Sequence, residues 1–295
     1  MRQERARQIM MRGHALPYDP VSVSTVPTFP HALVLHRVTC TFPARGRARA
    51  DYTAVRAASL RVRDGEFVSL VGPTGCGKST LLNVAAGLQA PTEGSVSIFG
   101  EPLHGLNAKA GYLFQSDALF PWRTALDNVA IGLELRGEER SQARDRALEW
   151  LRRVGLAAHA AKFPHEMSGG MRKRAALAQT LILEPRMLLM DEPFSALDVQ
   201  TRQLMENELL GLWAQDRRCV VFVTHDLEEA IALSDRVVVL SAGPASRPVA
   251  EYEVDLPRPR DVQEIAMHPR FVELHRSIWS ALKQEVMKAH GHADR

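Results

Sequence analysis

The sequence is poor in cysteine, has no long apolar run and carries only a small excess of positive charge. The three cysteines, Cys40, Cys76 and Cys219, lie far apart without a CxxC pair, so neither a zinc site nor a disulfide framework is indicated. No apolar run reaches the roughly 20 residues that a membrane-spanning helix needs. A net charge of +3 over 295 residues does not by itself indicate a nucleic-acid partner. We therefore expect a cytoplasmic protein that binds no nucleic acid and reaches a membrane only through another protein.

Short apolar segments alternate with helical patterns along most of the chain. This alternation predicts an α/β fold with a mostly parallel sheet. We expect strands at 33–42, 55–62, 66–72, 95–99, 111–115, 186–192, 218–225 and 235–241, and helices from Lys78, within 124–184, at 199–214 and at 227–233.

The two ends of the chain differ from this pattern. Residues 1–30 mix Arg, Pro, Ser and Thr without periodicity, so we expect a disordered leader. Residues 43–51 are rich in arginine and are expected to form a basic loop. Residues 268–290 have apolar positions three and four residues apart, which predicts an amphipathic helix.

The segment GPTGCGKST at 72–80 matches the pattern G-x-x-x-x-G-K-[ST] between an expected strand and an expected helix. Glycines let backbone N–H groups face phosphate oxygens, and the helix N-terminus adds partial positive charge. A chance glycine turn is the alternative, but the strand–loop–helix context favours a phosphate-binding loop. Its candidate residues are Gly72, Pro73, Thr74, Gly75, Cys76, Gly77, Lys78, Ser79 and Thr80, with Lys78 on the phosphates and Ser79 on Mg²⁺.

The segment MLLMDEP at 187–193 places two acids at the end of an apolar strand. Ligands bind at this edge of open α/β sheets. Asp191 is the expected partner of Mg²⁺, and Glu192 can act as the general base on the attacking water. Two solvated acids at the end of a surface strand are the alternative, which the preceding apolar run disfavours.

The segment MSGGM at 167–171 precedes a long helical stretch. Ser168 and the two glycines after it offer hydroxyl and N–H donors at a helix N-terminus. The chain therefore carries a second candidate phosphate-binding element.

With this segment, the set of motifs resembles the ATP-binding subunit of an ABC transporter over about residues 32–242. The resemblance implies a P-loop NTPase core with helices on both faces of its sheet, an antiparallel β subdomain and an α-helical signature subdomain at about 116–175. It places the ATP-binding domain at 31–245 and a C-terminal helical extension at 246–295. ATP and Mg²⁺ are the implied cofactors. The implied partners are a second copy, a transmembrane permease at whose cytoplasmic face the chain works and, indirectly, a periplasmic or lipoprotein substrate-binding protein.

In that family, the signature loop of one copy closes on ATP held by the other copy. Ser168, Gly169 and Gly170 match this loop. Met171 departs from the usual glutamine, which puts a side-chain amide contact, and hence the strength of dimer closure, in doubt.

Three further residues match family motifs. Gln115 resembles the glutamine that touches Mg²⁺ or the attacking water, and Asp198 in SALD resembles the aspartate at the dimer seam. His225 resembles the switch histidine that contacts the γ-phosphate. A plain strand-end glutamine and a core histidine are the alternatives, and the strand-end positions favour function.

The adenine-stacking aromatic has two candidates. Phe42 matches the family position at the end of the first strand, and Tyr52 beyond the basic loop is the competitor.

The segments DALFPW, PHEMSGGMRKR and THDLEEAIALSDRV resemble importers of nitrate, sulfonate, taurine and related small anions. In that group Phe120 and Trp122 would contact the permease, with the core of the helical subdomain as the alternative. Other readings are an importer of another solute, a non-transport ABC ATPase and an ordinary P-loop kinase or GTPase. The kinase or GTPase would lack MSGGM, SALD and the His225 segment.

Overall fold

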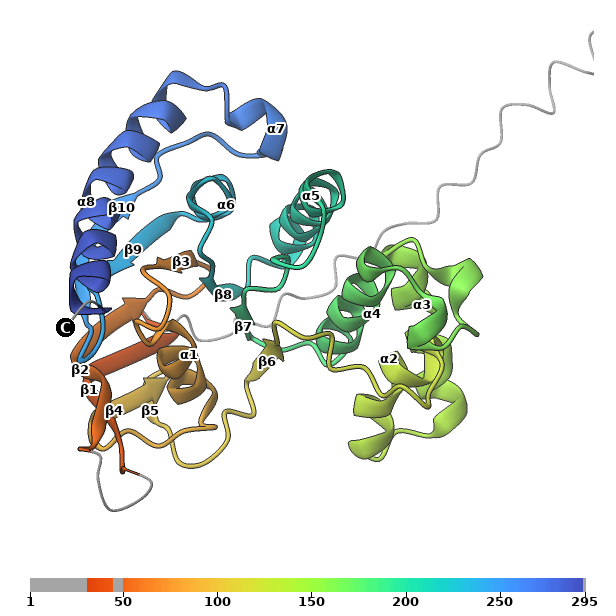
Figure 1. Ribbon diagram of the computed structural model, residues 1–295. Coiled ribbons are helices and arrows are strands. Elements are labelled where there is room, and N and C mark those ends of the chain that lie inside the picture. Colours follow the sequence, from red (N-terminus) through yellow and green to blue (C-terminus); the bar gives the residue numbers. More distant parts are fainter. Residues whose placement is uncertain (1–30, 45–49, 294–295) are drawn as a thin grey trace, which may run out of the picture.

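A computed structural model describes residues 31–44 and 50–293. The expected leader and residues 45–49 of the expected basic loop lie outside the described residues. The described part has two sheets with helices on both sides of the larger one (Figure 1). The predicted fold class is therefore confirmed.

The larger sheet has six strands in the order β10-β9-β3-β8-β7-β6. Five of them run parallel, and β10 pairs with β9 antiparallel at one edge. The two central strands, β3 and β8, are buried along their whole length, as expected for parallel strands covered on both faces. The strand bounds are β3 Phe67–Val71, β6 Ala110–Leu113, β7 Met187–Asp191, β8 Cys219–Val223, β9 Arg236–Leu240 and β10 Pro248–Glu253.

The smaller sheet is antiparallel, with the order β2-β1-β4-β5. Its inner face, helix α1 (Lys78–Ala86) and one face of the larger sheet share a single apolar cluster. The end of β1 pairs with the start of β2, so the two candidate adenine-stacking aromatics are cross-strand neighbours. The strand bounds are β1 Leu33–Phe42, β2 Tyr52–Val62, β4 Glu93–Ile98 and β5 Glu101–Pro102.

A group of helices lies beyond β6 and β7 (Figure 1). Its members α2, α3 and α4 pack on one another, and α4 also packs on β6. Two short 3₁₀ helices, at 157–159 and 164–166, lead into α4. The bounds are α2 Ala125–Leu135, α3 Arg140–Arg153 and α4 Gly169–Leu181.

The other face of the larger sheet is covered by α5 (Val199–Asp216), α6 (Leu227–Leu233) and the C-terminal helix α8 (Pro269–Ala293), with the one-turn α7 (Val262–Ile265) beside them. Helix α8 contacts α6, β9 and β10. The apolar stripe expected on this helix is buried, with Phe271, Leu274, Ile278 and Leu282 in the core. Among the residues that the structure describes, no helix is both long and apolar enough to cross a membrane.

The structure adds three short elements that the apolar pattern does not indicate: β5, β10 and α7. Strand β10 lies at a sheet edge and all six of its residues are partly or fully exposed, so it lacks the apolar run of the central strands. Strand β5 has two residues and α7 has four, which is too short for a periodic signal.

Candidate nucleotide-binding site

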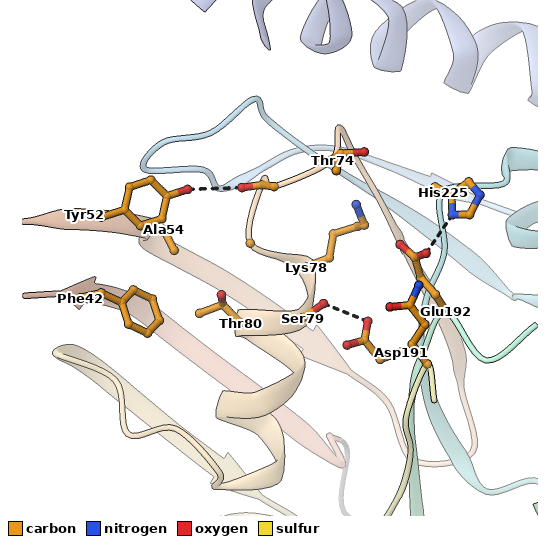
Figure 2. Close-up of a pocket in the computed structure, with 13 residues that line it drawn as sticks. Phe42, Tyr52, Ala54, Thr74, Lys78, Ser79, Thr80, Asp191, Glu192 and His225 are labelled. Carbon is orange, nitrogen blue, oxygen red and sulfur yellow. Dashed lines mark hydrogen bonds and ion pairs between the residues drawn. The ribbon is translucent and has the colours of Figure 1, made fainter. Parts of the chain in front are cut away.

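One pocket gathers most of the candidate residues at the carboxyl ends of the parallel strands. It has a volume of about 580 Å³. Figure 2 shows two aromatic side chains on one side of the pocket, acids and a histidine on the other, and Lys78 between them. The lining residues are Phe42, Tyr52, Ala54, Thr74, Gly75, Gly77, Lys78, Ser79, Thr80, Gln115, Asp191, Glu192 and His225.

The loop before α1 has the shape that phosphate binding needs. Gly77 has φ +90° and caps the helix, which is the left-handed conformation that glycine adopts at least cost. A Cβ on Gly77 would lie 2.7 Å from Cγ1 of Val55, so a larger residue does not fit there. The first N–H groups of α1 have no partners within the helix and can bind an anion.

Lys78 is buried, and its ammonium lies across this loop. Nζ donates to the carbonyl oxygens of Gly72 at 2.9 Å and Pro73 at 3.2 Å. A lysine has three donor protons, so one remains for a phosphate oxygen. Cys76, also buried, contributes its carbonyl oxygen as the acceptor for the Ser246 hydroxyl.

The oxygen ligands expected for Mg²⁺ lie together. The Ser79 hydroxyl donates to Oδ1 of Asp191 at 3.0 Å, and Gln115 lines the same pocket. A hydroxyl, a carboxylate and an amide oxygen form the donor set that Mg²⁺ prefers. These residues therefore fit the ion by their chemistry.

Tyr112 supports this set of oxygen donors, although the motifs did not single it out. Its hydroxyl donates to Oδ1 of Asn83 on α1 at 2.9 Å, and its ring stacks on Phe114 at 4.2 Å. Burial raises the pKa of Asp191 above its ordinary value, while the hydrogen bond from Ser79 acts in the opposite direction. Tyr112 thus ties strand β6 to α1.

Glu192 and His225 form the candidate hydrolytic pair. Oε2 of Glu192 lies 3.0 Å from Nδ1 of His225, and both side chains line the pocket. Glu192 has φ +44°, a left-handed conformation that is uncommon for a residue with a side chain. Its backbone N–H donates to the carbonyl of Val223 at the end of β8. Backbone conformations of this kind cluster at active sites.

Phe42 and Tyr52 face the same pocket, as their cross-strand pairing requires. The Tyr52 hydroxyl donates to the carbonyl of Gly75 at 3.4 Å, and this residue is 48% exposed. In Figure 2, Ala54 lies between the side chains of Tyr52 and Phe42, and Phe42 lies toward Thr80. Both aromatics can therefore reach a bound base, and the geometry keeps the two candidates open.

The candidate signature residues do not line this pocket. Ser168 caps α4, and its hydroxyl accepts from the N–H of Met171 at 3.3 Å. Gly169 and Gly170 form the first turn of the same helix, which lies beyond β6 and β7 (Figure 1). Asp198 caps α5 by accepting from the N–H of Thr201 at 3.0 Å and is likewise outside the pocket.

Helix α4 is bound to residues 115–117 by side chains that the motifs did not single out. Nζ of the buried Lys173 on α4 donates to the carbonyl of Gln115 at 2.6 Å and pairs with Asp117 at 3.1 Å. Arg172 pairs with the same carboxylate at 2.8 Å. The only sequence signal is the basic run after MSGG, because the acid lies more than 50 positions earlier.

Comparisons with known proteins find relatives of this chain. The family described as ABC transporter matches residues 55–195. An uncharacterized ABC transporter ATP-binding protein of Methanocaldococcus jannaschii is 46% identical over 231 residues, covering 78% of this chain and 85% of that protein. The nitrate import ATP-binding protein NrtC of Synechococcus elongatus is 42% identical over 237 residues, covering 80% of this chain and 36% of that longer protein.

A solved structure has the same fold. The ATP-binding cassette MJ0796, determined as a dimer in a post-hydrolysis state bound to ADP and Pi, matches with a TM-score of 0.67 and 32% identity over 76% of this chain and 100% of that one. Together with the phosphate-binding loop and the acidic strand end, these similarities show that the chain belongs to the ABC transporter family, as an ATP-binding and ATP-hydrolysing subunit.

Proposed function

We propose that this subunit powers import of a small anion, such as nitrate, sulfonate or taurine, by closing around ATP as a dimer beneath a membrane permease. The observation that carries the proposal is that the candidate site residues form two separate groups. Lys78, Ser79, Asp191, Glu192 and His225 converge on one pocket, whereas the serine–glycine helix start lies outside it.

In the proposed reaction, water attacks the γ-phosphate in line with the leaving oxygen. Glu192 orients this water and accepts its proton, and the nearby His225 ring keeps the carboxylate in place and contacts the γ-phosphate. Lys78 and the N–H groups of the loop stabilise negative charge on the phosphates.

Mg²⁺ would be held by Ser79 and Asp191, with Gln115 as the third contact. When bound, it neutralises charge on the β- and γ-phosphates. Gln115 also joins the pocket to α4 through Lys173, which is a physical route from nucleotide to the helical group.

The second copy is needed because one chain does not complete the phosphate site. In the proposed dimer, Ser168, Gly169 and Gly170 of one copy close on the γ-phosphate held by the other, with Asp198 at the seam. The cassette MJ0796, which has the same fold and was solved as a dimer bound to ADP and Pi, supports the proposal of a dimer.

The proposed permease contact is an exposed aromatic pair. Trp122 is 72% exposed and Phe120 38% exposed, with ring centroids 5.5 Å apart. The alternative that Trp122 belongs to the core of the helical group is therefore wrong. Exposed aromatics are common anchors of protein interfaces. This contact would hold the subunit at the cytoplasmic face of the membrane and link it indirectly to the external substrate-binding protein.

The small-anion assignment is supported by the transport roles named for two relatives. Besides the nitrate import protein, the bicarbonate transport ATP-binding protein CmpC of Synechococcus elongatus is 40% identical over 80% of this chain. An importer of a different solute is the alternative, because the ATP-binding subunit does not contact the solute.

The test is to purify the subunit with its permease and binding protein, reconstitute them in liposomes and measure ATPase activity with candidate solutes. We expect nitrate, bicarbonate or a small sulfonate to stimulate hydrolysis, and the Trp122→Ala variant to lose that stimulation while keeping basal activity. Stimulation only by a sugar, a peptide or an amino acid would contradict the anion assignment. The transport role would be contradicted if the subunit did not copurify with the permease and if no solute changed its rate of ATP hydrolysis.

A further inference from the structure

Helix α6 connects the candidate hydrolytic pair to the C-terminal part of the chain. His225 and Asp226 directly precede the helix. The Asp226 carboxylate accepts from the N–H groups of Glu228 and Glu229 and pairs with Arg202 of α5 at 3.1 Å. The placement of this helix end therefore determines where the His225 ring lies relative to Glu192.

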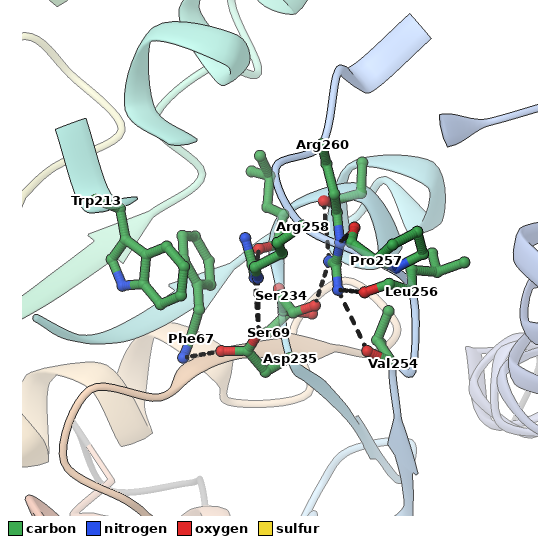
Figure 3. Close-up of polar contacts among 12 residues, drawn as sticks. Phe67, Ser69, Trp213, Ser234, Asp235, Val254, Leu256, Pro257, Arg258 and Arg260 are labelled. Atoms are coloured by element: carbon green, nitrogen blue, oxygen red, sulfur yellow. Dashed lines mark hydrogen bonds and ion pairs between the residues drawn. The ribbon is translucent and has the colours of Figure 1, made fainter. Parts of the chain in front are cut away.

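The opposite end of α6 is bound by arginine side chains, and the buried one is Arg260. Nη1 of Arg260 donates to the carbonyl oxygens of Ile231 at 3.3 Å, Ala232 at 3.1 Å and Ser234 at 2.7 Å (Figure 3). The last carbonyls of a helix have no partners within it, and a helix of seven residues is marginal by itself. Arg260 thus binds three of the carbonyl oxygens at the end of this helix.

The same guanidinium holds the segment between β10 and α7, residues 254–261, which we call the strap. Nη2 of Arg260 donates to the carbonyls of Val254 at 3.2 Å and Leu256 at 3.1 Å. Arg258, also in the strap, pairs with Asp235 at 2.8 Å and donates to the carbonyl of Leu233 at 2.8 Å. The strap therefore binds the C-terminal end of α6 through two arginines.

The positive charge of Arg260 lies at the C-terminal end of α6. The side chain is 7% exposed, and no carboxylate of the described residues forms an ion pair with it. Burial lowers the pKa of Arg260 to about 10, so the group is still charged at neutral pH. Positive charge is favoured at a helix C-terminus and negative charge at its N-terminus, where Asp226 and Glu228 lie.

A role as a simple tether does not require such a buried cation. Helix α8 is already attached to the core by Phe271, Leu274, Ile278 and Leu282. A buried charge is costly unless hydrogen bonds compensate for its lost hydration. Arg260 instead directs its donors to the ends of two segments, α6 and the strap, and so fixes one against the other.

We propose that Arg260 is a positioning residue for ATP hydrolysis: by closing the C-terminal end of α6, it holds His225 at the other end of the helix against Glu192. The proposal rests on the proposed roles of these two residues. It makes the C-terminal extension a structural part of the hydrolytic centre.

The experiment uses the full chain and compares Arg260→Met, Arg260→Lys and Arg270→Met. Arg270 is the matched control, because it lies in the same extension but pairs with Asp255 and Glu273 at the surface. At a temperature where melting curves show every variant folded, we expect Arg260→Met to lower kcat about tenfold, with KM for ATP changed less than about twofold. Arg260→Lys should recover part of the loss, and Arg270→Met should match the unmodified chain.

A double-mutant cycle with His225→Ala separates positioning from a general structural effect. If Arg260 acts through His225, Arg260→Met should cause no further loss of kcat in the His225→Ala background. Full addition of the two losses, or an unchanged kcat in folded Arg260→Met, would overturn the proposal. Wild-type activity of His225→Ala would contradict the proposed role of His225 and this proposal with it. This result differs from the two above, which overturn the role of Arg260 alone. If Arg260→Met does not fold, Arg260→Lys carries the same cycle, and an unchanged kcat in it is equally contradictory.

Discussion

The two candidate phosphate-binding elements of this chain differ in how many of their partner residues lie beside them. The loop before α1 is surrounded by its partners: the lysine, the hydroxyl, the acids and the histidine all line one pocket. The start of α4 has a capping serine and two glycines but lies outside that pocket. In the proposed dimer, the first element holds the nucleotide of its own copy and the second contacts the nucleotide held by the other copy.

The two elements also differ in their supports. The loop before α1 follows the fully buried strand β3, which gives it a rigid base. The start of α4 belongs to the helical group and is linked to the pocket through Lys173 and the Gln115 segment. Chemistry should therefore reside at the rigid element, and nucleotide-dependent movement should involve the other one.

The largest expected effect is the loss of hydrolysis in Glu192→Gln. The amide keeps the shape of the side chain but cannot accept the proton of the attacking water, so we expect turnover to fall at least about a thousandfold. ATP binding should persist, because the phosphate-binding loop is intact. Phosphate release and nucleotide binding measure the two effects, with Glu228→Gln on the exposed face of α6 as the control. Substantial turnover in Glu192→Gln would assign the base elsewhere.

The next effect is on affinity at the loop before α1. Lys78→Ala removes a charged donor from the phosphates, and we expect a loss of about 3 kcal/mol, or about 100-fold in ATP affinity. Isothermal titration of the single copy measures it. Lys109→Ala, which removes a surface pair with Glu101, should bind ATP normally. Unchanged affinity in Lys78→Ala would contradict the proposed site.

The aromatic side of the pocket distinguishes two candidates. Stacking on a base contributes about 1–3 kcal/mol, so loss of the stacking ring should weaken ATP binding by about 5-fold to 150-fold. We expect this loss in Phe42→Ala and a smaller one in Tyr52→Ala. The same titration with ATP and GTP measures both, and the reverse order would assign stacking to Tyr52.

The smallest effect concerns the start of α4. Met171→Gln restores the side chain that the family usually has there, and one added hydrogen bond contributes about 0.5–1.5 kcal/mol. We therefore expect ATP-dependent dimerisation to strengthen a few-fold, with ATP affinity of the single copy unchanged. Sedimentation at several protein concentrations measures this difference. Weaker dimerisation would place residue 171 away from the seam.

Most of the larger sheet and most of the pocket follow from local patterns. The strands ending at Val71, Asp191 and Val223 are short apolar runs, and each is followed within two residues by candidate site residues. Such runs predict buried parallel strands, and parallel strands bring their carboxyl ends to one edge.

Other parts depend on contacts between distant residues and have no local signal. The Lys173–Gln115 contact joins residues 58 positions apart, and a buried arginine such as Arg260 looks like any solvated arginine in sequence. Phe42 and Tyr52 are not separable from sequence, because strand pairing places both at the same end of the pocket.

The most direct test of a site shared between two copies is sedimentation velocity of Glu192→Gln with ATP, alone and combined with Gly169→Ala. A Cβ on Gly169 would meet only Leu197 at 3.5 Å and Arg172 at 3.9 Å, so the single copy accommodates it without strain. The matched control is Gly211→Ala, where a Cβ has no neighbour within 4 Å.

A shared site predicts a dimer for Glu192→Gln and for its Gly211→Ala combination. For the Gly169→Ala combination, we expect dimerisation weaker by about tenfold or more, because the methyl group stands where the partner's phosphate must approach. ATP affinity of the single copy should be the same in all three. An ATP-bound Glu192→Gln that stays monomeric, or a Gly169→Ala combination that dimerises as tightly as the control, would contradict the shared site.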